Sequence, residues 1–169
     1  MSEPAAAPVF AAGLVDVRPA HSFDEAKFGA YLKGRLEGYA GDLVVKQFEG
    51  GQSNPTYLLA SGDRRWVLRK KPPGKLLPTA HAVEREHRIL AALQGTDVPV
   101  PRVCLTSDDE SVVGTPFFVM EFVPGRVFHD PTLPGVEPPD RAAMYDDMNR
   151  VLAALHAVDY VARGLVDYG

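Results

Sequence analysis

A glutamate within an apolar helical stripe is the first residue of this sequence that suggests chemistry. In the segment 79–93 the apolar residues recur at helical spacing, and Glu86 lies among them, four residues after Ala82 and three before Ile89. Glu84 points to another side of the same helix. A carboxylate that faces a core is costly unless it is paired, so we expect a cationic partner from a neighbouring strand.

The segment RRWVLRK, residues 64–70, offers that partner. Strand alternation places Val67 and Arg69 on one face and Trp66, Leu68 and Lys70 on the other. A guanidinium can bind a carboxylate through two parallel hydrogen bonds, and the pair could then hold the guanidinium for a phosphate while Val67 covers a flat ring. A structural ion pair or a solvated charge is the alternative interpretation of the same residues.

The stretch FEGGQSNPTYLL, residues 48–59, has two alternative interpretations as well. Two glycines, a polar cluster and a proline separate two β-rich runs, which is typical of a hairpin turn. The same residues could form a loop whose backbone N–H groups surround a phosphate. The local sequence does not distinguish the turn from the phosphate loop.

The elements that must position these residues follow from hydrophobic periodicity and turn signals. Ser22 and Glu25 form a capping-box pattern for a helix that runs to about Leu36, and Thr79 is a plausible N-cap for the helix 80–93. The β-rich segments are 43–50, 56–61, 64–70, 98–107 and 112–125, and a last helix follows the proline-rich stretch 131–139 and ends near residue 158. This order predicts an α+β fold with a five-stranded antiparallel sheet and one inserted helix.

The order of these motifs resembles the N-terminal lobe of a kinase. EGGQSN, WVLRKKPPG, AVEREHRIL, VPVPRV and FFVMEFVPG are similar to the aminoglycoside phosphotransferase and choline kinase family. VLRKKPPGKLLPTAHAVERE is especially similar to the kinase-like part of acyl-CoA dehydrogenase family members. The likeness covers about residues 40–169, and the combined order is more specific than any single motif.

This resemblance implies a role for each matching residue. Arg69 stands where many kinases have a strand lysine, with Glu86 as its helix partner, and Lys70 and Lys71 are possible stand-ins for that lysine. Met120 would lie behind the adenine, the backbones of Glu121 and Val123 would hydrogen-bond its edge, and Pro124-Gly125 would be the hinge. The nucleotide-positioning loop would consist of Gly50, Gly51, Gln52, Ser53 and Asn54.

The chemical groups that complete a kinase are not found in this sequence. The family carries a catalytic loop with an aspartate for the acceptor hydroxyl and an asparagine for Mg²⁺, and then a second metal-binding aspartate. His129-Asp130 lacks the required spacing, and Asp167-Tyr168-Gly169 has no catalytic loop before it. We therefore expect an N-lobe, residues 21–125, after a flexible tail, residues 1–20, and before a connector with the first helix of a second lobe, residues 126–169.

The implied activity is transfer of the γ-phosphoryl group of ATP, with Mg²⁺, to a hydroxyl of a small molecule such as a hydroxyacyl-CoA. The catalytic residues and Mg²⁺ ligands would lie beyond Gly169, so this chain alone should be inactive. A non-catalytic nucleotide-binding or pseudokinase module is the alternative, because the metal-binding half is missing and Arg69 replaces lysine.

Composition narrows the remaining function classes. The 169 residues are 46% hydrophobic and 24% charged, which is typical of a globular domain, and the single Cys104 favours a reducing, cytoplasmic setting. No apolar run is long enough to span a membrane. The net charge of −4 argues against nucleic-acid binding, and alternation divides the basic cluster between Arg64 and Lys75 over two faces and a loop.

Two further expectations concern side chains outside the motifs. The five histidines lack metal-ligand spacing. In the last helix, apolar residues at helical spacing are interpreted as core, and in this chain alone Met144, Met148 and Leu155 would be exposed where a second lobe should pack. The apolar residues are Met144, Met148, Val151, Leu152 and Leu155. The sequence leaves the acceptor molecule and the oligomeric state open.

Overall fold

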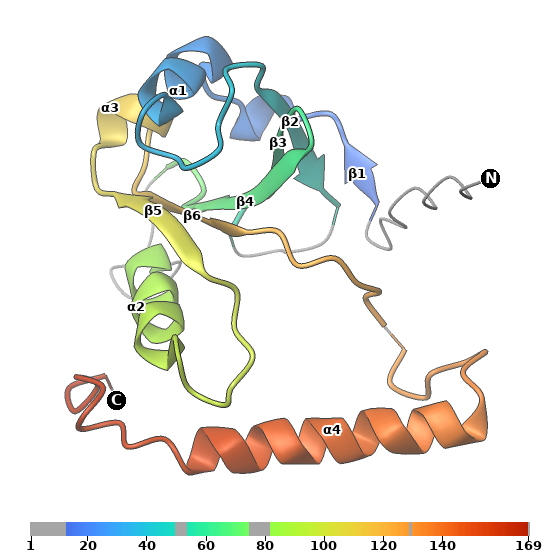
Figure 1. Ribbon diagram of the computed structural model, residues 1–169. Helices are drawn as coiled ribbons and strands as arrows, with labels where there is room; N and C mark the ends of the chain where they lie inside the picture. The colour runs from blue at the N-terminus through green and yellow to red at the C-terminus, as the bar shows by residue number, and fades with distance from the viewer. Residues whose placement is uncertain (1–12, 50–53, 75–81, 129, 169) are drawn as a thin grey trace.

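A computed structural model of the chain describes residues 13–49, 54–74, 82–128 and 130–168. Its centre is a six-stranded antiparallel sheet with the strand order β1-β2-β3-β4-β6-β5 (Figure 1). The strands are β1 Leu14–Val15, β2 Val44–Phe48, β3 Thr56–Ser61, β4 Arg64–Lys70, β5 Val103–Ser107 and β6 Phe117–Glu121. The α+β class and the five expected strands are confirmed, and β1 is an addition.

Strand β1 lies inside the segment that was expected to be a flexible tail. Leu14 pairs with Phe48 and Val15 with Gln47, and the backbone N–H of Arg18 donates to Gln47 Oε1 at 3.1 Å. A short 3-10 helix, Pro19–His21, follows. The tail prediction was therefore wrong from residue 14 onward, because a two-residue strand is too short to show alternation and depends on the free edge of β2.

The helices differ from the expected ones mainly at their ends. Helix α1, Glu25–Leu32, begins after Asp24, whose side chain accepts from Lys27 N, while the Ser22 hydroxyl donates backward to Pro19 O. Helix α2, Val83–Leu93, has no side-chain cap at Ala82, and Thr79 lies outside the described residues. Helix α4 spans Pro138–His156.

A short helix that the sequence did not indicate joins β5 to β6. Helix α3, Glu110–Val113, begins after Asp109, whose side chain accepts from Ser111 N, and ends at Gly114 with φ 85°. The expected strands 98–107 and 112–125 leave room only for a short connection at this point. One helical turn is too short to produce hydrophobic periodicity, so only the cap residues could have indicated it.

The hydrophobic core lies between one face of the sheet and helices α1 and α3 (Figure 1). Phe28 of α1 is fully buried and meets Phe117 edge to face, with ring centroids 5.6 Å apart. Strands β2, β3, β4 and β6 contribute the rest of this face, including Val45, Tyr57, Leu59, Trp66, Leu68 and Val119. Helix α2 lies on the opposite face, where it contacts β5 and β6.

Lys70 is a buried cation on the core face. Only 3% of the residue is exposed, its Nζ donates to the carbonyl of Val113 at 2.8 Å, and the ammonium lies 5.3 Å from the centroid of the Phe23 ring. Burial lowers the pKa of Lys70 from its usual 10.5. The residue therefore anchors the carboxyl end of α3 at an electrostatic cost.

Helix α4 lies apart from the sheet and has no buried residue (Figure 1). Met148 is 63% exposed and Leu155 is 44% exposed, whereas Met144 is partly buried. The core assignment of this stripe is therefore wrong within the described chain, and the expected exposure of Met148 and Leu155 is confirmed. An apolar stripe indicates that a face should be covered, but not which segment covers it.

None of the helices in the described part of the chain is long and apolar enough to cross a membrane.

We predict that the two apolar groups differ sharply in their contribution to stability. Phe28→Ala should lower the free energy of unfolding by about 3–5 kcal/mol, because it opens a cavity between α1 and Phe117. Met148→Ala should change it by less than about 0.5 kcal/mol, because that side chain is exposed. Denaturant unfolding of the two variants tests this, and equal losses would contradict the described core.

Lys70 gives a second prediction, on pH. Because its pKa is lower in the folded chain, the unfolded chain binds more protons between that value and 10.5, so the stability of the wild type should rise with pH across this window. Lys70→Met should lack this rise. Unfolding free energies measured from pH 7 upward should therefore diverge in favour of the wild type, and parallel curves would refute the shifted pKa.

Candidate functional site

An Arg–Glu ion pair joins strand β4 to helix α2 on the sheet face opposite the core. Arg69 Nε donates to Glu86 Oε2 at 2.6 Å, and Arg69 Nη2 donates to Glu86 Oε1 at 3.0 Å. Alternation in β4 puts Arg69 on this face, and the helical stripe turns Glu86 toward it. The predicted bidentate pair is confirmed.

Two neighbours close this pair into a ring of hydrogen bonds. Asn54 Nδ2 donates to Glu86 Oε1 at 2.6 Å, and Arg69 Nη1 donates to Thr56 Oγ1 at 2.9 Å. The Thr56 hydroxyl in turn donates to the carbonyl of Asn54 at 3.2 Å. The ring links the start of β3, the end of β4 and α2, so moving any one of these segments breaks at least two hydrogen bonds.

Part of the Arg69 guanidinium remains available to a ligand. A guanidinium carries five N–H donors, of which Glu86 takes two and Thr56 takes one, so two have no partner among the described residues. The side chain is 26% exposed, and that of Glu86 is 36% exposed. The remaining donors are thus held in fixed directions near solvent, which suits an anion such as a phosphate.

Asn54 has an unsatisfied acceptor beside this ring. The residue is 3% exposed, and its Oδ1 has no hydrogen-bond partner in the part of the chain that the structure describes. The amide orientation is chemically fixed, because the carboxylate of Glu86 can only accept and must face the NH₂ group. The Asn54 NH₂ group therefore donates to Glu86, while its Oδ1 is buried and points away from that carboxylate.

The other loop residues of the sequence prediction, Gly50, Gly51, Gln52 and Ser53, lie outside the described residues. Their role in positioning a nucleotide stays a prediction. Asn54, the last residue of that loop, lies in the ring, where its side chain contacts protein groups.

An apolar row lies next to the ring on the same face of the sheet. Leu58 pairs with Val67, and Val67 pairs with Met120, so all three side chains share the face of Arg69. Leu58 and Val67 are 5% and 7% exposed, and Met120 is partly buried. The predicted placement of Val67 on the face of Arg69 is confirmed, and Met120 lies on this face as well.

The expected hinge residues lie at and beyond the end of β6. The backbone N–H of Glu121 donates to Arg102 O at 2.9 Å, and Glu121 Oε1 accepts from Arg102 N at 2.9 Å. The backbone N–H of Glu121 is therefore already used within the protein. Val123 is 61% exposed.

Lys70 and Lys71 do not substitute for Arg69 in pairing with Glu86. Lys70 is on the core face, and Lys71 Nζ pairs with Glu84 Oε1. Burial raises the pKa of the Glu84 carboxyl, but hydrogen bonds from Lys71 and from its own backbone outweigh this effect, so the pKa is lowered overall. The end of β4 therefore holds α2 through two separate ion pairs.

The described residues offer binding groups rather than a complete reaction centre. They contain no group of three His, Cys, Asp or Glu side chains that could hold a metal ion. Asp130 Oδ1 accepts from both the backbone N–H and the hydroxyl of Thr132, so this carboxylate stabilises a turn before α4. The arrangement can fix an anion and a flat apolar group on one face of a sheet.

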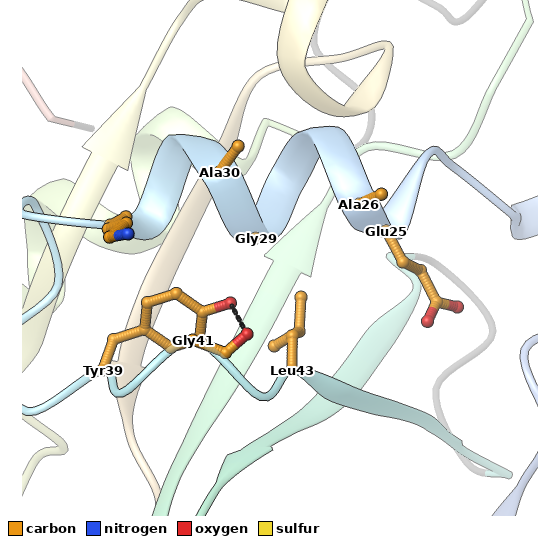
Figure 2. A pocket seen from close by; sticks show the side chains of 8 residues that line it. Glu25, Ala26, Gly29, Ala30, Tyr39, Gly41 and Leu43 are labelled. Atoms are coloured by element: carbon orange, nitrogen blue, oxygen red, sulfur yellow. Dashed lines mark hydrogen bonds between the residues drawn. The ribbon is translucent and has the colours of Figure 1, made fainter.

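A separate pocket of about 540 Å³ lies between α1 and the segment 39–43 (Figure 2). Tyr39 and Leu43 face the helix across it, and the Tyr39 hydroxyl donates to the carbonyl of Gly41 at 3.2 Å. It includes none of the predicted site residues and lies on the α1 side of the sheet.

Sequence reasoning missed Thr56 and assigned Asn54 to a phosphate loop only. The position of Thr56 could have been predicted from the sequence, because Gly62-Asp63 is a two-residue turn that pairs Ser61 with Arg64. Continuing that register pairs Thr56 with Arg69. No comparable signal placed the Asn54 amide against Glu86, since that contact depends on where α2 packs.

Comparison with known proteins places these features in a family. The model of the phosphotransferase enzyme family matches residues 44–169. Acyl-CoA dehydrogenase family member 10 of Mus musculus is 48% identical over 154 residues, which are 90% of this chain and 14% of that protein. Family member 11 of Rattus norvegicus is 46% identical over 159 residues, 92% of this chain and 20% of that protein.

A solved structure supports the same assignment. A protein of Ralstonia eutropha JMP134, assigned as an aminoglycoside phosphotransferase, is 49% identical with a TM-score of 0.75, over 88% of this chain and 42% of that one. The chain thus spans 14–20% of the curated relatives' length and less than half of the solved chain. The family resemblance and the kinase-like fold are confirmed. Because the family model covers β2 through α4, the chain belongs to the phosphotransferase enzyme family.

Proposed function

We propose that this chain is the nucleotide-binding part of an ATP-dependent phosphotransferase that acts on a hydroxyl group of a small molecule. The observation that carries the proposal is the Arg69–Glu86 pair, in which the carboxylate fixes the guanidinium and two N–H donors stay free among the described residues. Those donors would bind phosphate oxygens of ATP. When bound with Mg²⁺, the nucleotide would supply the transferable phosphoryl group.

The neighbouring residues would orient the rest of the nucleotide. Val67, Leu58 and Met120 form an apolar row on the face that carries Arg69, which suits a flat base. The Glu121 carbonyl and the backbone of Val123 would meet the edge of that base at the end of β6. Residues 21–125 would be the N-lobe, and 126–169 would lead to a second lobe with the acceptor site and the Mg²⁺ ligands.

A hydroxyacyl-CoA is the acceptor class that we propose first. The support is chemical and indirect. Phosphoryl transfer requires a nucleophilic oxygen, and the curated relatives named above are acyl-CoA dehydrogenase family members, whose name refers to acyl-CoA. An intracellular nucleotide and the single, partly buried Cys104 suit a reducing cytoplasmic setting.

One observation favours a second candidate, a nucleotide-binding module without catalysis. Arg69 occupies the position of the usual lysine, and three of its five donors are already used within the protein. A guanidinium that is fixed by these hydrogen bonds could bind a nucleotide without binding the transition state of phosphoryl transfer more strongly. Turnover by the full-length protein distinguishes the two candidates.

We predict that nucleotide affinity depends on the Arg69 fork. In the full-length protein Arg69→Gln should weaken ATP binding by about tenfold to a hundredfold, because a charged hydrogen-bond donor to phosphate is lost. Arg69→Lys should lose less, since it keeps the charge without the fork. Calorimetric titration with ATP measures both, and Arg150→Gln, which removes an exposed Arg–Asp pair on α4, is the matched control. Unchanged affinity in Arg69→Gln would refute the phosphate role.

We also predict an acceptor. The full-length protein, incubated with ATP and Mg²⁺ and a panel of hydroxyacyl-CoAs, amino alcohols and aminoglycosides, should form ADP and a phosphorylated hydroxyacyl-CoA. Phosphorylation of an amino alcohol or an aminoglycoside instead would replace the proposed acceptor. ATP binding without turnover on any acceptor would support the non-catalytic candidate.

A further inference from the structure

The segment that follows α4, residues 159–168, lies against the end of α2 (Figure 1). We call it the C-terminal segment. It contacts α2 through residues that the ring around Glu86 does not use. Its Leu165 is 8% exposed, so the segment is packed as well as hydrogen-bonded.

Two arginines of α2 hold this segment. Arg88 Nη2 donates to the carbonyl of Gly164 at 2.6 Å, and the Arg88 guanidinium pairs with the carboxylate of Asp167. Arg85 Nη2 donates to the carbonyl of Tyr168 at 2.6 Å, with its guanidinium carbon 4.7 Å from the centroid of the Tyr168 ring. The Tyr168 hydroxyl donates back to the carbonyl of Arg85 at 3.2 Å.

A third arginine belongs to the C-terminal segment and donates to the helix. Arg163 of the C-terminal segment donates from Nη1 to the carbonyl of Gln94, the C-cap residue of α2, at 3.0 Å. The contacts therefore reach both the first turn and the carboxyl end of the helix. A cation at the carboxyl end of a helix is also favoured by the helix dipole.

Helix geometry separates these contacts from the candidate site. Arg85 and Arg88 are three residues apart and share a face, whereas Glu86 points to the sheet from another side. Helix α2 is thus held through Glu86 by Arg69 on its sheet side, through Glu84 by Lys71 of the strand end, and through Arg85 and Arg88 by the C-terminal segment.

Among the described residues, helix α2 packs on β5 and β6 with little fully buried surface, and its His87 ring lies 6.2 Å from the ring of Phe118. Only Val83 and Leu93 are buried among its residues, and its N-cap makes no side-chain hydrogen bond. A helix with little buried apolar surface moves more readily than one packed into a core. Its polar contacts must therefore contribute much of what determines its position.

We propose that Arg85 and Arg88 are positioning residues: by binding the C-terminal segment they hold α2 where Glu86 reaches Arg69. Each exposed ion pair alone is weak, but this segment contributes several contacts to one short helix. The part of the proposal that concerns nucleotide affinity rests on the proposed function. The part that concerns α2 does not.

The first measurement is amide hydrogen exchange in the full chain. Arg85→Gln/Arg88→Gln should speed exchange in α2 by about tenfold and leave the core strands unchanged, because a local restraint is lost. The charge-swapped pair Arg88→Asp/Asp167→Arg should restore slower exchange than Arg88→Asp alone. Arg150→Gln is the control for removing an exposed Arg–Asp pair elsewhere. Unchanged exchange in α2 would overturn the proposal.

The second measurement is a double-mutant cycle on ATP affinity in the full-length protein. Arg85→Gln/Arg88→Gln should weaken binding by about threefold to tenfold, and it should cause no further loss in a Glu86→Gln background, because the effect passes through Glu86. Equal losses in both backgrounds would show that the arginines do not act through Glu86. If the wild type binds no ATP, the proposed function fails, while hydrogen exchange still decides whether the segment holds α2.

Discussion

The half-buried carboxylate of Glu86 is the constraint on which the arrangement of α2 depends. A charge on the sheet-facing side of a helix must be paired, and Arg69 supplies both of the hydrogen bonds that a carboxylate can accept side by side. Removing either partner would leave the other with a single hydrogen bond among the described residues, from Asn54 to Glu86 or from Arg69 to Thr56. Because α2 buries only two of its residues, this pair matters more for the position of the helix than it would in a well-packed core.

An arginine builds such a pair differently from a lysine. A lysine is a compact point charge that turns freely, whereas a guanidinium has five donors in one plane. Once Glu86 fixes that plane, the direction of every other donor is fixed, and Thr56 is placed to accept one of them. Thr56 thus accepts from a donor whose direction the guanidinium plane sets, and Asn54 completes the ring by donating to Glu86.

The sequence was informative wherever a charge or a turn restricted the geometry. The apolar stripe around Glu86, the alternation of β4 and the two-residue turn at Gly62-Asp63 are sufficient to place Arg69, Glu86 and Thr56 near one another. It was uninformative where an element depends on its neighbours. Strand β1 exists because β2 has a free edge, and the apolar stripe of α4 could not show that nothing in the described chain covers it.

The division of the sheet into two faces explains how this site can be both precise and adjustable. The aromatic core with α1 and α3 stabilises one face, while the ring of Asn54, Thr56, Arg69 and Glu86 occupies the other. Changes in the position of α2 therefore need not disturb the core. On the other face α2 has only Val83 and Leu93 buried, so ion pairs on more than one side of the helix add to what holds it in place. The C-terminal segment and the guanidinium at the end of β4 thus bind the same helix through separate sets of charges.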